Sequence, residues 1–248
     1  ITSATEEVYR VLNEGDNVSV TATFWDNSSN SIESVIVTDD DGIGVDNASG
    51  TPTLNIVVDT AGDGPDVADS RTATYVSGST SNALVFQYTI QSGDNDTNGI
   101  SIGANALALN SGTIRDVAGN NATITHSSVA ANSSYKVDTT APTVSSVAIT
   151  SATGIQNNLL NAGDVISVTA TFSENVPVTG TPQLTLVVGG TNRTATYTSG
   201  SGSTPLVFQY TIQAGDNDTD GISIGANVLA LNSGTISDPA GNNATLTH

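Results

Sequence analysis

The sequence of 248 residues predicts an all-β protein made of two tandem β-sandwich domains. Short runs of alternating apolar and polar residues recur along the chain, and this period of two is typical of half-buried strands. No stretch of about 11 residues or more shows the 3.6-residue period of an amphipathic helix. The second half also repeats the first, because residues 71–126 return as residues 193–248 with roughly four positions in five identical. Such a repeat indicates two homologous domains rather than one enzyme built around a single cleft.

The predicted strands occur in matched pairs, one in each half, separated by clusters of Gly, Asn, Asp and Ser that are typical of turns. Their aromatic side chains, Phe86 and Tyr88 in the first half and Phe208 and Tyr210 in the second, are expected in the core. About seven short strands per ~110 residues is the pattern of an Ig-like sandwich. The paired runs are 17–24 with 165–172, 51–58 with 181–188, 71–77 with 193–199, 84–91 with 206–213, and 121–126 with 243–248.

The domain boundary is predicted at residues 137–143, where Pro142 stiffens a short connection. The sequence stops at His248, the counterpart of His126, whereas the first domain continues past His126 through SSVAANSSYKVD. We therefore expect the second domain to lack its last strand. The predicted domains are 1–137, with two acidic loop insertions at about 25–50 and 59–70, and 138–248.

The chain is strongly acidic, with 24 Asp and Glu residues against 5 Lys and Arg residues and a formal net charge of −19. Nucleic-acid binding needs clustered Lys and Arg, so this composition excludes a nucleic-acid partner and disfavours anionic membrane surfaces. Uncompensated carboxylates favour cations as partners, or secretion into a medium of high salt concentration. A simple need for solubility would give the same composition. No apolar run approaches the ~20 residues of a membrane span, so no membrane insertion is expected.

Four motifs occur in order in the second half: VDTTAPTVSSV, GDVISVTATFSENV, GDNDTDGISI and SDPAGNNAT. Together they resemble the bacterial Ig-like tandem repeats of giant surface adhesins, of the repeat-in-toxin and biofilm-associated type. The resemblance covers nearly all of residues 138–248, and the first domain apart from its insertions. It implies a location on a bacterial cell surface, neighbouring Ig-like repeats of the same chain as partners, and a non-enzymatic extender role, often with calcium at the domain junctions.

A candidate calcium loop lies in the second domain, where Asp216, Asp218 and Asp220 precede Gly221. Carboxylates at positions 1, 3 and 5 followed by Gly match the opening of an EF-hand loop, because a tight turn aims alternate side chains at one hard cation. The match ends at the twelfth position, which is Asn227 rather than Glu, and a polar turn without an ion is the alternative. The first-domain copy places Asp94, Asp96 and Asn98 at the same three positions, with one charge fewer.

A second candidate cluster follows from counting strand directions. If each predicted strand crosses the sandwich once, Glu174 and Asp238 lie at the end of the second domain where Asp138 enters. In a head-to-tail array this end meets the loop of Asp94, Asp96 and Asn98 from the first domain, and so many carboxylates would repel one another unless a cation such as calcium lay between them. A flexible, hydrated joint with screened charges is the alternative. Asp116, the first-domain counterpart of Asp238, completes the set of candidate ligands.

Two functions stay open. One is a calcium-stiffened structural extender that projects an adhesive tip. The other is a ligand-binding adhesion module, in which Trp25 and the first-domain insertions, including the run Asp39–Asp41, contact a host or cell-surface glycan or protein. Catalysis finds no support, because the chain has no Cys nucleophile, no GxSxG or HExxH motif and no P-loop. The two histidines, His126 and His248, occupy equivalent positions, which favours a structural role.

Overall fold

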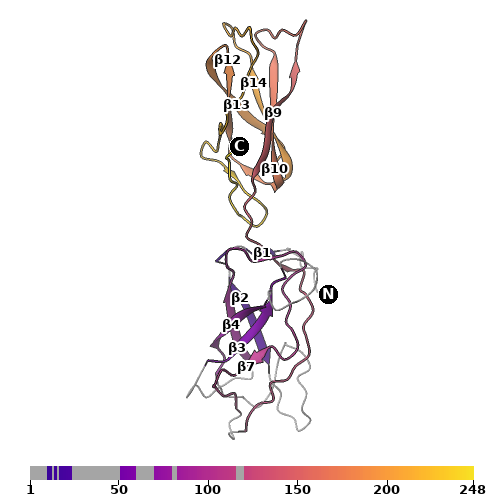
Figure 1. Cartoon of the computed structure of the whole chain (residues 1–248), viewed down its shortest axis with the longest axis vertical. Coiled ribbons are helices and arrows are strands. Elements are labelled where there is room, and N and C mark those ends of the chain that lie inside the picture. Colours follow the sequence, from indigo (N-terminus) through magenta and orange to yellow (C-terminus); the bar gives the residue numbers. More distant parts are fainter. Residues whose placement is uncertain are drawn as a thin grey trace, which may run out of the picture. The chain divides into compact units, whose positions relative to one another are not determined.

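The prediction of an all-β fold is confirmed by the computed structural model (Figure 1), which contains strands and no helix among the residues it describes. No helix within this part of the chain is long and apolar enough to cross a membrane. The described residues are 10–12, 14–15, 17–23, 51–59, 70–79, 83–115 and 120–248.

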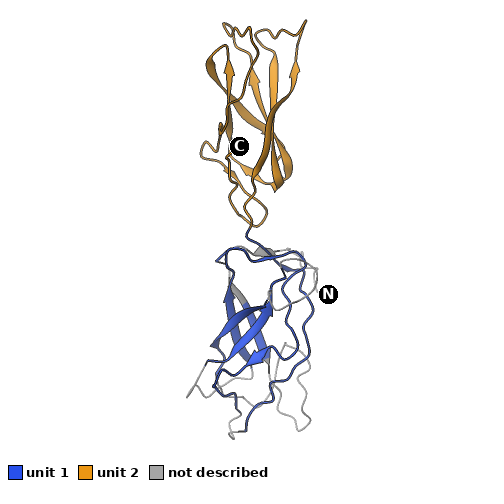
Figure 2. Ribbon diagram, in the orientation of Figure 1, with its two compact units in different colours: residues 1–139 blue, residues 140–248 orange. Residues whose placement is uncertain are grey.

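The chain divides into two compact units, residues 1–139 and residues 140–248 (Figure 2). Each unit buries its own hydrophobic cluster. Corresponding residues of the two units are related by the sequence repeat.

The first unit contains a five-stranded antiparallel sheet in the order β2-β5-β4-β3-β7 and a three-stranded sheet in the order β1-β8-β6. In the smaller sheet β8 is the central strand, parallel to β1 and antiparallel to β6. The strands of this unit are β1 (Arg10–Leu12), β2 (Asn17–Thr23), β3 (Thr53–Val57), β4 (Ser70–Ser77), β5 (Ala83–Thr89), β6 (Asn95–Asp96), β7 (Leu107–Ala108) and β8 (Tyr135–Asp138).

The second unit contains a six-stranded antiparallel sheet in the order β15-β12-β13-β14-β10-β9 and a two-stranded ribbon formed by β11 and β16. Its long strands β9 and β10 form a hairpin, and β10 also pairs with β14. The strands are β9 (Val144–Thr153), β10 (Val165–Val176), β11 (Val178–Thr179), β12 (Gln183–Val188), β13 (Thr191–Ser199), β14 (Ser203–Thr211), β15 (Leu229–Ala230) and β16 (Thr235–Ile236).

The cores of the two units are built in the same way around one phenylalanine. Phe86 and Phe208 are both 0% exposed. Each meets a tyrosine of the neighbouring strand edge-to-face, with ring centroids 6.0 Å apart for Tyr75 and Phe86 and 5.9 Å apart for Tyr197 and Phe208. The alternation that predicted these strands therefore reflects one face turned towards the core.

The predicted strands at 121–126 and 243–248 are wrong, because neither run belongs to a ladder. They form isolated bridges instead, such as Arg115 with Asn121 and Ser237 with Asn243. Alternate side chains of these runs, among them Ile124 and Leu246, pack against the core. The alternation in the sequence thus arises from packing onto the core rather than from pairing with a neighbouring strand.

Candidate metal centre

A tight turn that follows β16 holds Asp238 in a fixed orientation. Pro239 favours the turn because its φ is preset, and Gly241 adopts a φ of +97° that an L side chain rarely reaches. The Asp238 side chain is enclosed, since the residue is only 2% exposed. Its Oδ1 accepts hydrogen bonds from the N–H groups of Gly241 (2.7 Å) and Asn242 (2.8 Å), and its Oδ2 accepts one from the Asn242 amide (2.7 Å).

Two further carboxylates lie beside this turn. Glu174 lies near the end of β10, and Asp138 is the last residue of β8, at the start of the segment that leads into the second unit. One oxygen from each of Asp138, Glu174 and Asp238 lies within 4.8 Å of the others. Among the residues that the structure describes, no other group of three or more Asp, Glu, His or Cys side chains brings its ligand atoms this close together. We call them the carboxylate cluster.

The chemistry of the carboxylate cluster suits a hard cation. All three ligands are carboxylate oxygens, the type preferred by calcium and magnesium, whereas zinc favours His and Cys. Two unit charges 4 Å apart interact by about 1 kcal/mol in water and by about 4 kcal/mol at an effective dielectric constant of about 20. Three carboxylates in this arrangement therefore repel one another, and a divalent cation between them would remove that repulsion.

The loop predicted as an EF-hand-like opening begins with an ion pair. Asp216 accepts hydrogen bonds from Nε (2.8 Å) and Nη2 (2.6 Å) of Arg193 on β13. The Tyr210 hydroxyl (2.6 Å) and the Gln213 N–H (2.9 Å) also donate to this carboxylate, whose side chain is 1% exposed. These donors, the tyrosine first, lower the pKa of Asp216 from 3.8 to about 2. The charge of Asp216 is thus already compensated within the protein.

Acidification should destabilise the second unit through Asp216. A folded-state pKa of about 2, below the ordinary 3.8, means that the stabilisation is fully present above 3.8 and is lost as the pH falls towards 2. The unfolding midpoint, measured in chelator between pH 5 and pH 2, should therefore fall with pH. The Tyr210→Phe variant removes one of the donors that lower the pKa of Asp216, so its midpoint should fall less steeply with pH. An identical slope for the variant and the unaltered protein would show that the pH dependence does not arise at Asp216.

The next carboxylates of the loop shape its backbone. Oδ2 of Asp218 accepts the Gly189 N–H (2.8 Å), and Oδ1 accepts the N–H groups of Gly221 (2.7 Å) and Asp220 (3.2 Å). These backbone donors, that of Gly189 first, lower the pKa of Asp218. Asp220 is exposed. Asn227, at the twelfth position, accepts the His248 N–H through its side-chain oxygen (2.8 Å). Calcium binding by this loop stays a prediction from the sequence.

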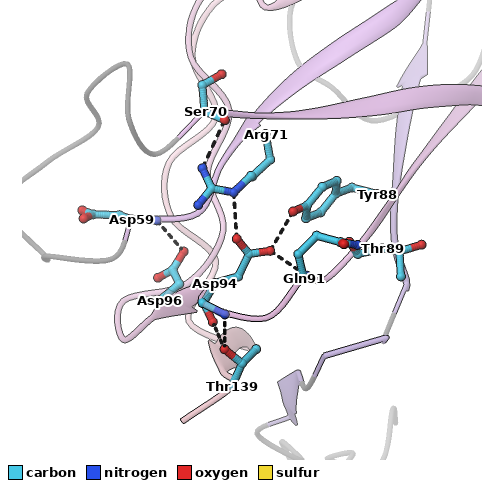
Figure 3. A network of polar contacts seen from close by, with 10 residues as sticks. Asp59, Ser70, Arg71, Tyr88, Thr89, Gln91, Asp94, Asp96 and Thr139 are labelled. Atoms are coloured by element: carbon cyan, nitrogen blue, oxygen red, sulfur yellow. Dashed lines mark hydrogen bonds and ion pairs between the residues drawn. The ribbon is translucent and has the colours of Figure 1, made fainter.

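The first-unit copy repeats this network (Figure 3). Asp94, which is 2% exposed, pairs with Nε of Arg71 (2.7 Å) and accepts hydrogen bonds from the Tyr88 hydroxyl (2.7 Å) and the Gln91 N–H (2.8 Å). Burial, followed by the hydrogen bond to Asp94, raises the pKa of Tyr88 to about 12. The Arg and Tyr partners were missed by sequence reasoning. The signal for them was one arginine repeated in the motif RTATY of a chain that has so few basic residues.

Asp96 occupies a more enclosed position than its counterpart Asp218. It is 1% exposed and accepts the N–H groups of Asn98 (3.1 Å), Gly99 (2.6 Å) and Asp59 (3.3 Å). The Asn98 amide donates to Asp59 (3.5 Å). Burial raises the pKa of Asp96, and the nearby Asp59 charge adds to the effect. Asp94, Asp96 and Asn98 are therefore engaged inside the first unit, and none of them belongs to the carboxylate cluster.

Each histidine closes a loop of its own unit. Nε2 of His126 accepts the Ala106 N–H (2.9 Å), and Nε2 of His248 accepts the Val228 N–H (3.4 Å). Several predicted features lie outside the described residues: Asp116, Trp25, the run Asp39–Asp41, the insertion at about 25–50, and the insertion at about 59–70 apart from its end residues Asp59 and Ser70.

Comparison of the chain with protein-family models, with curated proteins and with solved structures finds no match.

Proposed function

We propose that this chain is a non-catalytic, calcium-stiffened extender segment of a bacterial cell-surface adhesin. The observation that carries the proposal is the convergence of three carboxylates, Asp138, Glu174 and Asp238, from positions far apart in the sequence. The sequence repeat and the strong acidity support an array of similar units that recruits cations.

The carboxylate cluster fits calcium in both number and type of ligand. Calcium takes six to eight oxygens, and these three carboxylates can supply up to five of them, because Oδ1 of Asp238 already accepts two hydrogen bonds; water would complete the shell. Each carboxylate oxygen carries two lone pairs, so the hydrogen bonds that Asp238 accepts fill those of Oδ1 but leave one on Oδ2 for a cation. The turn therefore pre-orients this ligand without occupying it fully.

Calcium at the cluster would extend a contact that the second unit already makes. The segment that enters this unit is attached at residues 142–143: Thr245 N–H donates to the Pro142 carbonyl (2.8 Å), and Ser173 N–H donates to the Thr143 carbonyl (2.9 Å). The Thr143 N–H in turn donates to the Ser173 hydroxyl (3.0 Å). A cation held by Asp138, Glu174 and Asp238 would fix Asp138 to the second unit as well. It would thereby restrict the backbone between Asp138 and residue 142. Stiffness of the chain, rather than catalysis, is the expected effect.

Thermal unfolding of the whole chain in calcium and in chelator tests the proposal. A ligand that binds only the folded state adds about 2.7 kcal/mol when its free concentration is 100 times its Kd. We expect millimolar calcium to raise the midpoint of the second unit by on the order of 10 °C, with a smaller effect of magnesium. The Glu174→Gln variant should lose this rise, because it removes one charged ligand.

The Asp220→Asn variant is the matched control, since it removes an exposed acid of the same unit outside the cluster. It should retain the calcium effect. If calcium gives no specific rise in the unfolding midpoint, the proposal is wrong. If the rise is lost in Asp220→Asn but kept in Glu174→Gln, the ion binds in the 216–220 loop instead of the carboxylate cluster. Because the chain has no native Cys, spin labels at Thr72→Cys and Thr198→Cys can report stiffness separately. Calcium should narrow the distribution of distances between them.

A further inference from the structure

Residues 127–138 of the first unit cover the stretch that follows Asp96. They form a backbone ladder with it rather than a loose loop. The carbonyl of Tyr135 accepts the Ile100 N–H, and the Ile102 and Val129 backbones exchange two hydrogen bonds. The distances are 3.1 Å for Ile100 N to Tyr135 O, 3.0 Å for Asn132 N to Ile100 O, 3.0 Å for Ile102 N to Val129 O, and 2.8 Å for Val129 N to Ile102 O.

The end of this segment is β8, the central strand of its sheet. β8 pairs antiparallel with β6 and parallel with β1. Val137 of β8 is only 2% exposed and belongs to the core of the first unit. The segment thus contributes both backbone partners and an apolar side chain to the unit.

The second unit has the same edge without the cover. Ile222 and Ile224 correspond to Ile100 and Ile102, and Ser223 bridges Val187 just as Ser101 bridges Val57. Within residues 140–248, the N–H and C=O groups of Ile222 and Ile224 make no backbone hydrogen bond. Their side chains are half-buried, whereas those of Ile100 and Ile102 are 8% and 6% exposed. We call residues 221–224 the open edge.

The glycine that begins each edge shows the same difference. Gly99 and Gly221 have nearly the same backbone conformation, with φ of +103° and +105°. A Cβ on Gly99 would collide with the Asn132 carbonyl oxygen, because the covering segment passes directly over it. A Cβ on Gly221 would meet nothing within 4 Å. The backbone of the edge is therefore conserved between the units, and only the covering strand differs.

We propose that the open edge of the second unit is a strand-acceptor site, which binds one extended segment with the pattern of residues 127–138, joined to the second unit in the same chain order. Unpaired N–H and C=O groups template such a strand, and alternate side-chain positions select it. The selected pattern has an apolar residue at the positions of Val129 and Val137. A basic residue at the position of Lys136 suits the surroundings, because the second unit carries six acidic residues and one basic residue.

The test appends a copy of residues 127–138 directly after His248 of the whole chain. The measurement is made in chelator, so that the copy of Asp138 adds no metal effect. We expect the amide hydrogens of Ile222 and Ile224 to exchange at about one tenth of their rate in the unaltered chain, or more slowly. The thermal midpoint of the second unit should rise. The amides of Ile100 and Ile102, which are already covered, should exchange as before and serve as the internal reference.

The matched control carries the same appended residues with the copies of Val129 and Val137 both changed to Asp. Equal protection by this control, or no protection by the unaltered copy, would overturn the proposal. The free peptide of residues 127–138 tests the source of the strand. If it protects Ile222 and Ile224 fully at micromolar concentration, a separate chain suffices and the assignment of a joined strand is overturned. Weaker protection by the peptide than by the appended copy agrees with the proposal.

Discussion

Replacing Phe208 by Ala should lower the free energy of unfolding of the second unit by about 3–5 kcal/mol. Phe208 is 0% exposed and lies on β14, between Val168 of β10 and Tyr197 of β13. The substitution removes the apolar area of the ring, leaves a cavity and ends the edge-to-face contact with Tyr197. Urea unfolding, followed by a spectroscopic signal that reports on the second unit, gives the loss in the free energy of unfolding directly.

Val207→Ala is the matched control for this prediction. Val207 is the neighbour of Phe208 on the same strand, and its side chain points to the opposite face, where it is half-buried. Its loss should be clearly smaller. Similar losses for the two variants would mean that Phe208 does not organise the core of the second unit.

The strands that the sequence predicted correctly are those in which alternation and pairing coincide. β5 and β14 alternate because one face of each meets the core, and both also have ladder partners. The run at 243–248 alternates for the first reason alone, so it was wrongly predicted as a strand. The two-residue strands β6, β7, β11, β15 and β16 carry too few residues to show any period, and tertiary pairing defines them.

The candidate site divides in a similar way. Counting strand directions brings Asp138, Glu174 and Asp238 to one end, because Asp138 marks the entry to the second domain and alternate crossings of the sandwich return the chain to that end near Glu174 and Asp238. The same reasoning cannot find the partner of an acid across a sheet. Arg71 and Asp94 are 23 residues apart on different elements, and their contact depends on the register of β4 against β5. A motif that looks like a calcium loop in the sequence thus begins with an ion pair in the structure.

Replacing Asp94 by Ala should lower the free energy of unfolding of the first unit by about 3 kcal/mol. The change leaves the Arg71 guanidinium, the Tyr88 hydroxyl and the Gln91 N–H without their shared acceptor (Figure 3). We place the loss at the low end of the range for a broken buried pair because the Arg71 side chain is 24% exposed. Chemical denaturation of the whole chain measures it.

A double-mutant cycle with Arg71→Ala separates the ion pair from the other contacts. Once Asp94 is absent, removing Arg71 should cost little, so the two losses should be non-additive by more than about 0.5 kcal/mol. The same measurement in calcium and in chelator distinguishes the two roles of Asp94. A calcium ligand stabilises the fold only when calcium is present, whereas an ion pair stabilises it in both solutions. We expect an equal loss in both, and a loss seen in calcium alone would restore Asp94 as a metal ligand.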